Sequence, residues 1–516
     1  MQSRSVYSFF RRPARLIVFC ILILSGQITQ SALSSVFRFH LLTEPSSLRP
    51  AEQRSANSNY FLSQIYATLL SYRANQLTGS LAEECKYTNS KTLECRLRKD
   101  LKWSDGSPIE GKAFVKAMQE FVLPENRALR ADLLFPVKNA KEIYQGKKKP
   151  ETLGVVLKNK NILVFNLHSA DREFIYNLTS PLLTPTPANG FLPGKTVEKR
   201  ITSGPFKLVE WKTSGIQLAP NPEYWEKNLD RPQIEVLFIA EDSVALSLYE
   251  KKELSFLRRL PTLFIPKYKD SVEYHEIPQL RFDYIGFSKE LKDHPQLRKV
   301  LSTALSYDEL QKLFHARPRP GCPGLHSGLS LTSPCVDYQA NSDQLKAALA
   351  KEKPFTGKLT YAFSKQGGED HKRAAEWAQG QWKKNAGLTV ELQQTDNKIF
   401  LEQLAKNPAP LFRKGNSPER PTCLSALEAF ETGNPEDFLQ LDSPELQRTF
   451  KQLRQASSEI QRKKLCSQAL IFLINNNWLI PQGPIHFTIL AKSEWQGWDL
   501  NELNQLDLSL LKFQPR

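Results

Sequence analysis

Apolar stretches with strand-like and helix-like spacing alternate through most of the chain, which indicates mixed α/β layers. The clearest unit has a strand at 358–363, a helix at 371–384 and a second strand at 388–392. Gly387 is suited to end the helix. The apolar face of the helix contains Ala374, Ala375, Ala378 and Trp382. A strand, a helix and a strand in this order predict a right-handed crossover within a parallel sheet.

Residues 101–109 join a predicted strand to a predicted helix. The strand ends near Leu97, and Asp105 with Gly106 forms a dipeptide suited to a tight turn. Apolar residues then recur with helical spacing over 114–122.

Residues 203–211 begin a predicted β-hairpin. Pro205 precedes its first strand, Gly215 lies in the turn, and 216–218 returns as the second strand. The pattern continues to Trp225 through the sequence Asn-Pro-Glu-Tyr-Trp. Neither this segment nor the preceding one carries a catalytic motif, so both indicate a fold rather than a reaction.

The N-terminus has the organisation of a secretory signal peptide. A basic stretch ends at Arg15, an apolar run covers 16–24, and polar and small residues follow. This apolar run is too short to span a bilayer, which requires about twenty helical residues. We expect residues 1–32 to be a signal peptide cleaved after Ala32, and Cys20 not to be a lipidation site. The mature protein is therefore expected to be periplasmic.

The composition narrows the possible partners. At 516 residues the chain is too long for one hydrophobic core. It has 70 lysines and arginines against 54 aspartates and glutamates, but the two signs are interspersed. This pattern predicts a solvated basic surface and no nucleic-acid partner, although a basic surface also favours acidic ligands or anionic lipid headgroups.

The chain has seven cysteines, and cleavage of the signal peptide would remove one of them. An even number then remains, as is typical of disulfides in an oxidising compartment. Proximity in sequence favours the pairs Cys85 with Cys95, Cys322 with Cys335, and Cys423 with Cys466. Other connectivities stay open, as does a metal site in one loop, although disulfides are our prediction. The residues of that metal alternative are His315, Cys322, His326 and Cys335.

The segments 101–109 and 203–225 resemble signatures of the family 5 extracytoplasmic solute-binding proteins, the peptide-binding components of ABC importers. Residues 44–50 also match the family pattern Glu-Pro-x-x-Leu-Asp-Pro except at Arg49, and 297–305 resembles its Val-Arg-x-Ala-Leu helix. The resemblance implies an α/β fold like that of the type II periplasmic binding proteins. In this fold two lobes are joined by a hinge, and an extra inserted domain makes three domains.

The resemblance also implies where these domains lie. Residues 33–72, 181–278 and 487–516 would form the discontinuous lobe I, 73–180 the inserted second domain, and 279–486 the opposing lobe III. A ligand would then close the cleft between the lobes.

Residues 411–420 correspond to the family segment Arg-x-Gly-Trp-x-x-Asp-Tyr, whose aspartate receives the α-amino group of a bound peptide. Here the arginine and glycine match, whereas glutamate replaces the aspartate, asparagine the tryptophan and arginine the tyrosine. A strand at 281–287 adds a tyrosine that we expect to face the core or the edge of the cleft. The candidate ligand-binding residues are Glu419, Arg413, Gly415, Asn416, Arg420 and Tyr284.

The retained charges suggest roles for three of these residues. We expect Glu419 to bind an amine, and Arg413 or Arg420 to meet a carboxylate. Lys414 and Arg420 add positive charge, which would shift the ligand class towards acidic or otherwise anionic compounds. The alternative is that 408–421 is a solvated loop without a ligand.

Enzyme motifs are nearly absent. Residues 190–196 resemble a phosphate-binding loop but are one residue short, and His275 with Glu276 lacks the second histidine of a zinc protease. We therefore predict a non-enzymatic monomer without a cofactor, which captures peptides or peptide-like solutes and delivers them to an ABC transporter permease. Three alternatives stay open: the same fold with a metal chelate, haem or opine as ligand, a ligand-loaded sensor partner, and a periplasmic hydrolase.

Overall fold

The computed structural model describes residues 36–515, except 46, 54–55, 193–196, 198–199, 228–229, 314–340, 419, 435 and 457. Several predictions fall outside the described residues. They are the signal peptide at 1–32, Glu419, and the loop cysteines and histidines Cys322, Cys335, His315 and His326. No helix among the described residues is long and apolar enough to cross a membrane.

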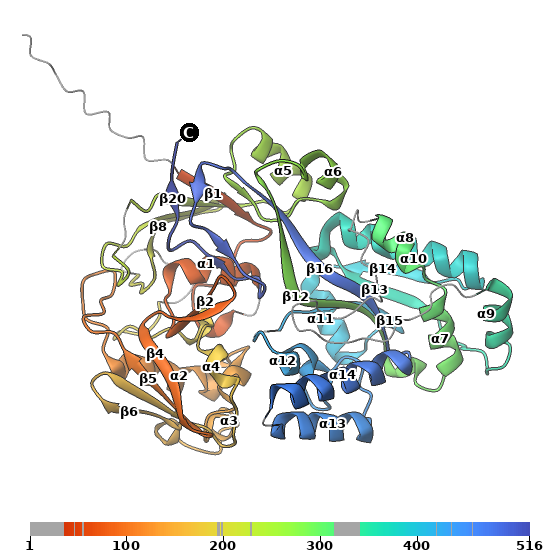
Figure 1. Ribbon diagram of the computed structural model, residues 1–516, viewed down its shortest axis with the longest axis horizontal. Helices are drawn as coiled ribbons and strands as arrows, with labels where there is room; N and C mark the ends of the chain where they lie inside the picture. The colour runs from red at the N-terminus through yellow and green to blue at the C-terminus, as the bar shows by residue number, and fades with distance from the viewer. Residues whose placement is uncertain are drawn as a thin grey trace, which may run out of the picture. The chain divides into compact units, whose positions relative to one another are not determined.

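One ten-stranded sheet runs through residues 36–515 (Figure 1). Its order is β14 (Glu391–Thr395), β13 (Thr360–Ser364), β15 (Leu411–Asn416), β12 (Tyr274–Phe287), β16 (Leu479–Ala491), β11 (Phe256–Leu257), β1 (Val36–Leu41), β10 (Gln233–Phe238), β9 (Gly215–Pro220) and β8 (Phe206–Lys212). The two long strands β12 and β16 pair antiparallel in the middle of the sheet. They therefore link two groups of strands.

Each group of strands has its own core. Phe39 of β1 and Val236 of β10 pack with α1 (Ala56–Ile65). In the other group, one face carries Tyr284 and packs on α12 (Cys423–Leu427), α13 (Pro444–Gln455) and α14 (Glu459–Asn475). The opposite face carries Ile285 and packs on α7 (Pro295–Thr303) and α10 (Gly368–Ala386). Because successive side chains of a strand point to opposite faces of the sheet, β12 contributes side chains to both of these cores.

The strand–helix–strand unit predicted late in the chain is confirmed. β13 and β14 are parallel, and α10 connects them. The apolar face of this helix is buried, and Gly387 ends it with a φ of +71°. The helix expected near 297–305 is confirmed as α7.

Both signature segments form the elements that their patterns predict. β5 (Thr92–Leu97) leads to a turn in which the Gly106 N–H donates to the Trp103 carbonyl at 2.9 Å, and α2 (Gly111–Phe121) follows. The φ of Gly106 is +84°, a conformation that other residues adopt only at a cost. β8 and β9 form the expected hairpin. Because the Trp103 side chain is buried, the first segment is scaffold.

A separate four-stranded sheet lies within the expected inserted domain. Its order is β4 (Ala82–Asn89), β5, β7 (Ile162–Asn166) and β6 (Val155–Asn159). The disulfide Cys85–Cys95 joins β4 to β5. A second disulfide, Cys423–Cys466, joins α12 to α14. Both are pairs expected from sequence proximity.

The described residues form further α-helices and short β-strands. The helices are α3 (Ala140–Tyr144), α4 (Phe174–Asn177), α5 (Asp242–Glu250), α6 (Ile265–Tyr268), α8 (Tyr307–Leu313), α9 (Ser342–Leu349) and α11 (Asn397–Lys406). The strands are β2 (Leu70–Arg73), β3 (Gln76–Gly79), β17 (Trp495–Gln496), β18 (Asp499–Leu500), β19 (Leu506–Asp507) and β20 (Lys512–Phe513).

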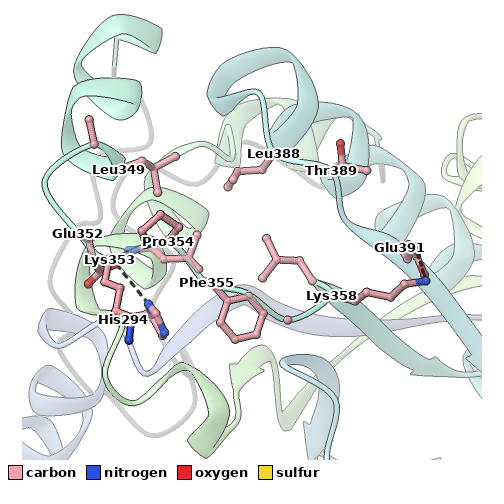
Figure 2. A pocket seen from close by; sticks show the side chains of 14 residues that line it. His294, Leu349, Glu352, Lys353, Pro354, Phe355, Lys358, Leu388, Thr389 and Glu391 are labelled. Atoms are coloured by element: carbon pink, nitrogen blue, oxygen red, sulfur yellow. Dashed lines mark hydrogen bonds and ion pairs between the residues drawn. The ribbon is translucent and has the colours of Figure 1, made fainter.

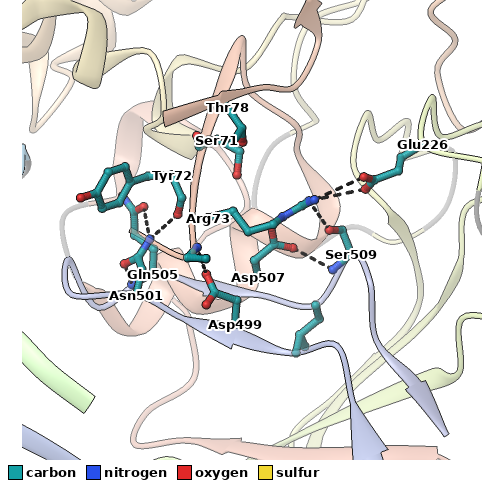
Figure 3. Close-up of polar contacts among 12 residues, drawn as sticks. Ser71, Tyr72, Arg73, Thr78, Glu226, Asp499, Asn501, Gln505, Asp507 and Ser509 are labelled. Carbon is teal, nitrogen blue, oxygen red and sulfur yellow. Dashed lines mark hydrogen bonds and ion pairs between the residues drawn. The ribbon is translucent and has the colours of Figure 1, made fainter. Parts of the chain in front are cut away.

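Arg73, at the end of β2, ties the C-terminal segment to the start of the expected inserted domain (Figure 3). Its guanidinium group lies 2.9 Å from Asp507, 3.3 Å from Glu226 and 2.6 Å from the Ser509 hydroxyl. All these contacts join segments far apart in the sequence. The end of β2 is therefore bonded to the C-terminal segment through contacts of Arg73 with Asp507 and Ser509.

We expect Arg73→Gln to lower the free energy of unfolding by about 1–3 kcal/mol, because Asp507 and Glu226 would lose a charged partner. Urea denaturation followed by circular dichroism measures this. Arg96→Gln is the matched control, because Arg96 is mostly exposed and its ion pairs with Glu83 and Glu84 lie at the surface. Equal losses for the two variants would contradict the assigned role of Arg73.

Candidate functional site

The candidate residues of β15 lie directly beside β12. Antiparallel pairing sets Gly415 opposite Asp283 and Arg413 opposite Ile285. β15 is a regular strand up to Asn416, so the first half of the 411–420 segment is part of the sheet. The solvated-loop alternative is therefore wrong for this half.

A buried carboxylate organises the site. Asp283 is 1% exposed and forms ion pairs with Arg413 and with Arg281, whose Nε lies 2.5 Å from Asp283 Oδ1. Burial acts to raise the pKa of Asp283, but the two guanidinium groups overcome this effect and lower it. Asp283 is therefore held as a carboxylate.

Arg413 has further partners around the same point. Its Nε donates to Gln482 Oε1 at 3.0 Å, and its Nη1 lies 3.1 Å from His371 Nδ1. Burial and the nearby guanidinium groups, Arg413 first, lower the pKa of His371 well below its ordinary value. His371 is therefore neutral here.

Gly415 and Tyr284 have structural positions in this arrangement. A Cβ at Gly415 would lie 2.4 Å from both Arg281 Nη2 and Asp283 Oδ1, so only glycine leaves room for that ion pair. Tyr284 is 1% exposed, and its ring centroid lies 5.3 Å from that of Phe430. We expected Tyr284 to face the core or the edge of the cleft, and the structure places it in the core.

Asn416 and Arg420 replace aromatic residues of the family pattern and make contacts within the chain. Asn416 Nδ2 donates to the Ala426 carbonyl at 2.8 Å. Arg420 is 6% exposed, and its guanidinium group lies 2.5 Å from Glu428 and 3.9 Å from Glu173. Both arginines that we expected to meet a ligand carboxylate thus already have carboxylate partners in the chain, as their burial requires.

Sequence reasoning missed four residues near this point, namely His40, Arg258, Arg259 and His371. Arg259 donates to Asp242 Oδ2 through Nη2 at 2.5 Å and through Nε at 2.8 Å. Arg258 lies over the ring of Tyr60, with 5.1 Å from its guanidinium carbon to the ring centroid. The only sequence signal is a pair of arginines directly after an apolar strand, which a solvated turn would also show.

A separate groove of about 510 Å³ lies near α7 and α9 (Figure 2). Leu349 and Phe355 give it apolar walls, and His294 Nδ1 lies 4.0 Å from Glu352 Oε2. Glu352 also accepts two backbone N–H groups from the first turn of α7, at 3.0 and 2.8 Å. None of the candidate ligand-binding residues that the structure describes lines this groove.

The part of the chain that the structure describes contains no cluster of three or more metal-ligating side chains. The groups that the structure places around β15 are buried ion pairs, a neutral imidazole and strand backbone.

Comparisons with known proteins place this arrangement in context. The profile of the bacterial extracellular solute-binding proteins, family 5 middle, matches residues 76–437. The oligopeptide-binding protein OppA of Bacillus subtilis is 24% identical over 488 residues, which cover 88% of this chain and 87% of the relative.

Two solved structures show the same fold. The murein tripeptide binding protein MppA of Escherichia coli matches with a TM-score of 0.82 at 20% identity, over 93% of this chain and 98% of that chain. Haemophilus influenzae OppA in complex with RPPGFSPFR matches with a TM-score of 0.80 at 20% identity, over 93% and 99% of the respective chains. The predicted type II periplasmic-binding-protein fold is confirmed.

The buried His40 makes stability depend on pH. Burial lowers its pKa from 6.5 to about 3, with smaller contributions from Arg258 and Arg259. Between these pH values only the unfolded chain binds the proton, so stability is lost as the pH falls below about 6.5. The loss through this one residue is about 1.4 kcal/mol for each pH unit.

We expect His40→Phe to flatten the fall in unfolding free energy between pH 6 and pH 4.5 by about this slope. Urea denaturation at several pH values measures it. His168→Phe, at an exposed position, is the control and should keep the wild-type slope. Equal slopes for wild type and His40→Phe would contradict a buried neutral His40.

Proposed function

This chain belongs to the bacterial extracellular solute-binding proteins of family 5, and on that premise we propose that it captures a peptide or peptide-like solute and delivers it to an ABC transporter permease. The names of the relatives support this proposal, because they are oligopeptide- and murein-tripeptide-binding proteins. The proposed activity is reversible binding without a catalytic step or a cofactor.

The open edge of β15 carries this proposal. β12 pairs with β15 along all of 411–416, whereas β13 pairs with it only at Leu411 and Phe412. From Lys414 onward, β15 has no strand partner on the β13 side among the described residues. An extended peptide can pair with such an edge through its main chain, which would give affinity with little dependence on side chains.

Contacts between distant segments support closure of the chain around a ligand. The Thr422 hydroxyl donates to Glu173 at 2.7 Å, and the Thr262 hydroxyl donates to Asp370 at 2.8 Å. With the domain division expected from the resemblance, these bonds cross from lobe III to the inserted domain and to lobe I. A ligand that binds the closed form better would shift the population towards it.

We further propose that the mature protein acts as a monomer outside the cytoplasm, after removal of residues 1–32. The two disulfides support this location, because such bonds persist in oxidising compartments. The permease would be the membrane partner.

Native mass spectrometry of the purified protein tests the function directly. We expect a series of added masses that fragment as short peptides, since an extended main chain would be the common feature recognised. A single non-peptide mass would overturn the peptide assignment. Complete absence of peptide binding in calorimetry would overturn the function itself.

We propose that Glu419 binds the α-amino group of the ligand. Glu419→Gln should weaken the binding of free-amine peptides by about 1–3 kcal/mol, because a charged hydrogen bond is lost. Calorimetry with free and N-acetylated peptides measures this, with Glu402→Gln at an exposed position of α11 as the control. Unchanged affinity for free-amine peptides would remove Glu419 from the site.

A further inference from the structure

One short segment of the expected inserted domain carries a high density of positive charge. Residues 138–149 contain five lysines and one glutamate, whereas the whole chain has 70 lysines and arginines against 54 aspartates and glutamates. All five lysines are exposed. This segment therefore differs from the interspersed charge pattern of the chain as a whole. We call the following set the lysine patch: Lys138, Lys141, Lys147, Lys148 and Lys149.

Hydrogen bonds join the two ends of this segment around α3 (Figure 1). Lys148 Nζ donates to Asn139 Oδ1 at 2.6 Å, and Asn139 Nδ2 donates to the Thr152 carbonyl at 2.6 Å. The Lys138 N–H donates to the carbonyl of Asn166, the last residue of β7, at 2.8 Å. The patch is therefore one compact unit of surface that is anchored to the four-stranded sheet.

Carboxylates do not offset the charge of the lysine patch. The acidic residues next to it in sequence, Glu142 and Glu151, are exposed. Neither they nor any other acidic residue that the structure describes forms an ion pair with the five lysines. By contrast, three exposed lysines elsewhere each pair with a glutamate two residues earlier in the chain: Lys86, Lys112 and Lys212.

The chemistry of the patch fits an extended partner. Residues 138–149 contain no arginine. Lysine is a point charge on a flexible stem and lacks the planar fork with which arginine binds a single carboxylate or phosphate. Several lysines on one surface instead add up many weak attractions to a partner with many negative charges. The headgroups of anionic lipids form such a partner, and basic clusters are attracted to them without a cavity.

We propose that the lysine patch binds the protein to an anionic lipid surface. None of the candidate ligand-binding residues belongs to the patch, so lipid binding and peptide binding use different side chains. The inference goes beyond the proposed carrier function and does not depend on it. A carrier held at the membrane surface would search that surface for its permease.

Co-sedimentation of the exported protein with lipid vesicles tests the proposal. One set of vesicles contains phosphatidylcholine and phosphatidylglycerol, and the other contains phosphatidylcholine alone, so only the first is anionic. We expect the protein to bind the anionic vesicles only, and high salt to weaken this binding through screening. The triple variant Lys147→Gln, Lys148→Gln and Lys149→Gln should bind them at least about tenfold more weakly, because each lysine near an anionic surface adds to the attraction.

The matched control is the triple variant Lys86→Gln, Lys112→Gln and Lys212→Gln. It loses the same charge at exposed lysines that already have carboxylate partners, and it should bind like the wild type. Should the first triple variant not fold, Lys138→Gln with Lys141→Gln takes its place and should also weaken binding.

Equal losses in the patch variant and the control variant would overturn the inference, because attraction would then depend only on the net charge. Equal binding of the wild type to both kinds of vesicle, or to neither, would also overturn it. If the wild type binds soluble polyglutamate through the patch but does not bind the anionic vesicles, the partner is an acidic polymer and the lipid inference is wrong. The carrier function is tested separately, by peptide binding in the absence of lipid.

Discussion

The antiparallel pairing of β12 with β16 is the constraint on which the architecture depends. The register runs from Tyr274 opposite Leu490 to Gly286 opposite Leu479, so one ladder holds together two groups of strands with separate cores. The register shifts between Pro278 and Phe282, and such irregularities interrupt the hydrogen bonds and let a strand bend. Bending there would change the approach of the two groups of strands.

The geometry of the candidate site around β15 depends on a second constraint, the burial of Asp283 on β12. A carboxylate at this depth needs compensation, and Arg281 from the same strand and Arg413 from β15 provide it. The ion pair lies where a side chain on Gly415 would be, which explains why glycine stands at that position. The ion pair of Arg413 with Asp283 thus joins β15 to β12. Among the described residues, the other edge of β15 has no strand partner from Lys414 onward.

The departures from the family pattern have a coherent explanation in this setting. Arg420, in place of a tyrosine, pairs with Glu428 and Glu173, and Asn416, in place of a tryptophan, bonds to the Ala426 carbonyl. Side chains that sequence comparison assigns to the ligand are therefore used to join segments of the protein.

The sequence by itself determined the local elements and, through its signature segments, the fold. The turn at Gly106, the hairpin of β8 and β9 and the unit around α10 depend on glycine conformation and apolar periodicity, which act between near neighbours. The disulfide Cys85–Cys95 could be predicted for the same reason, since its cysteines lie close in sequence. Only the tertiary structure decided which charges compensate one another. Arg413 meets Asp283 across 130 residues, and His40 meets arginines more than 200 residues away. Electrostatic partners are set by distance in space, and residue spacing along a chain of this length does not determine that distance.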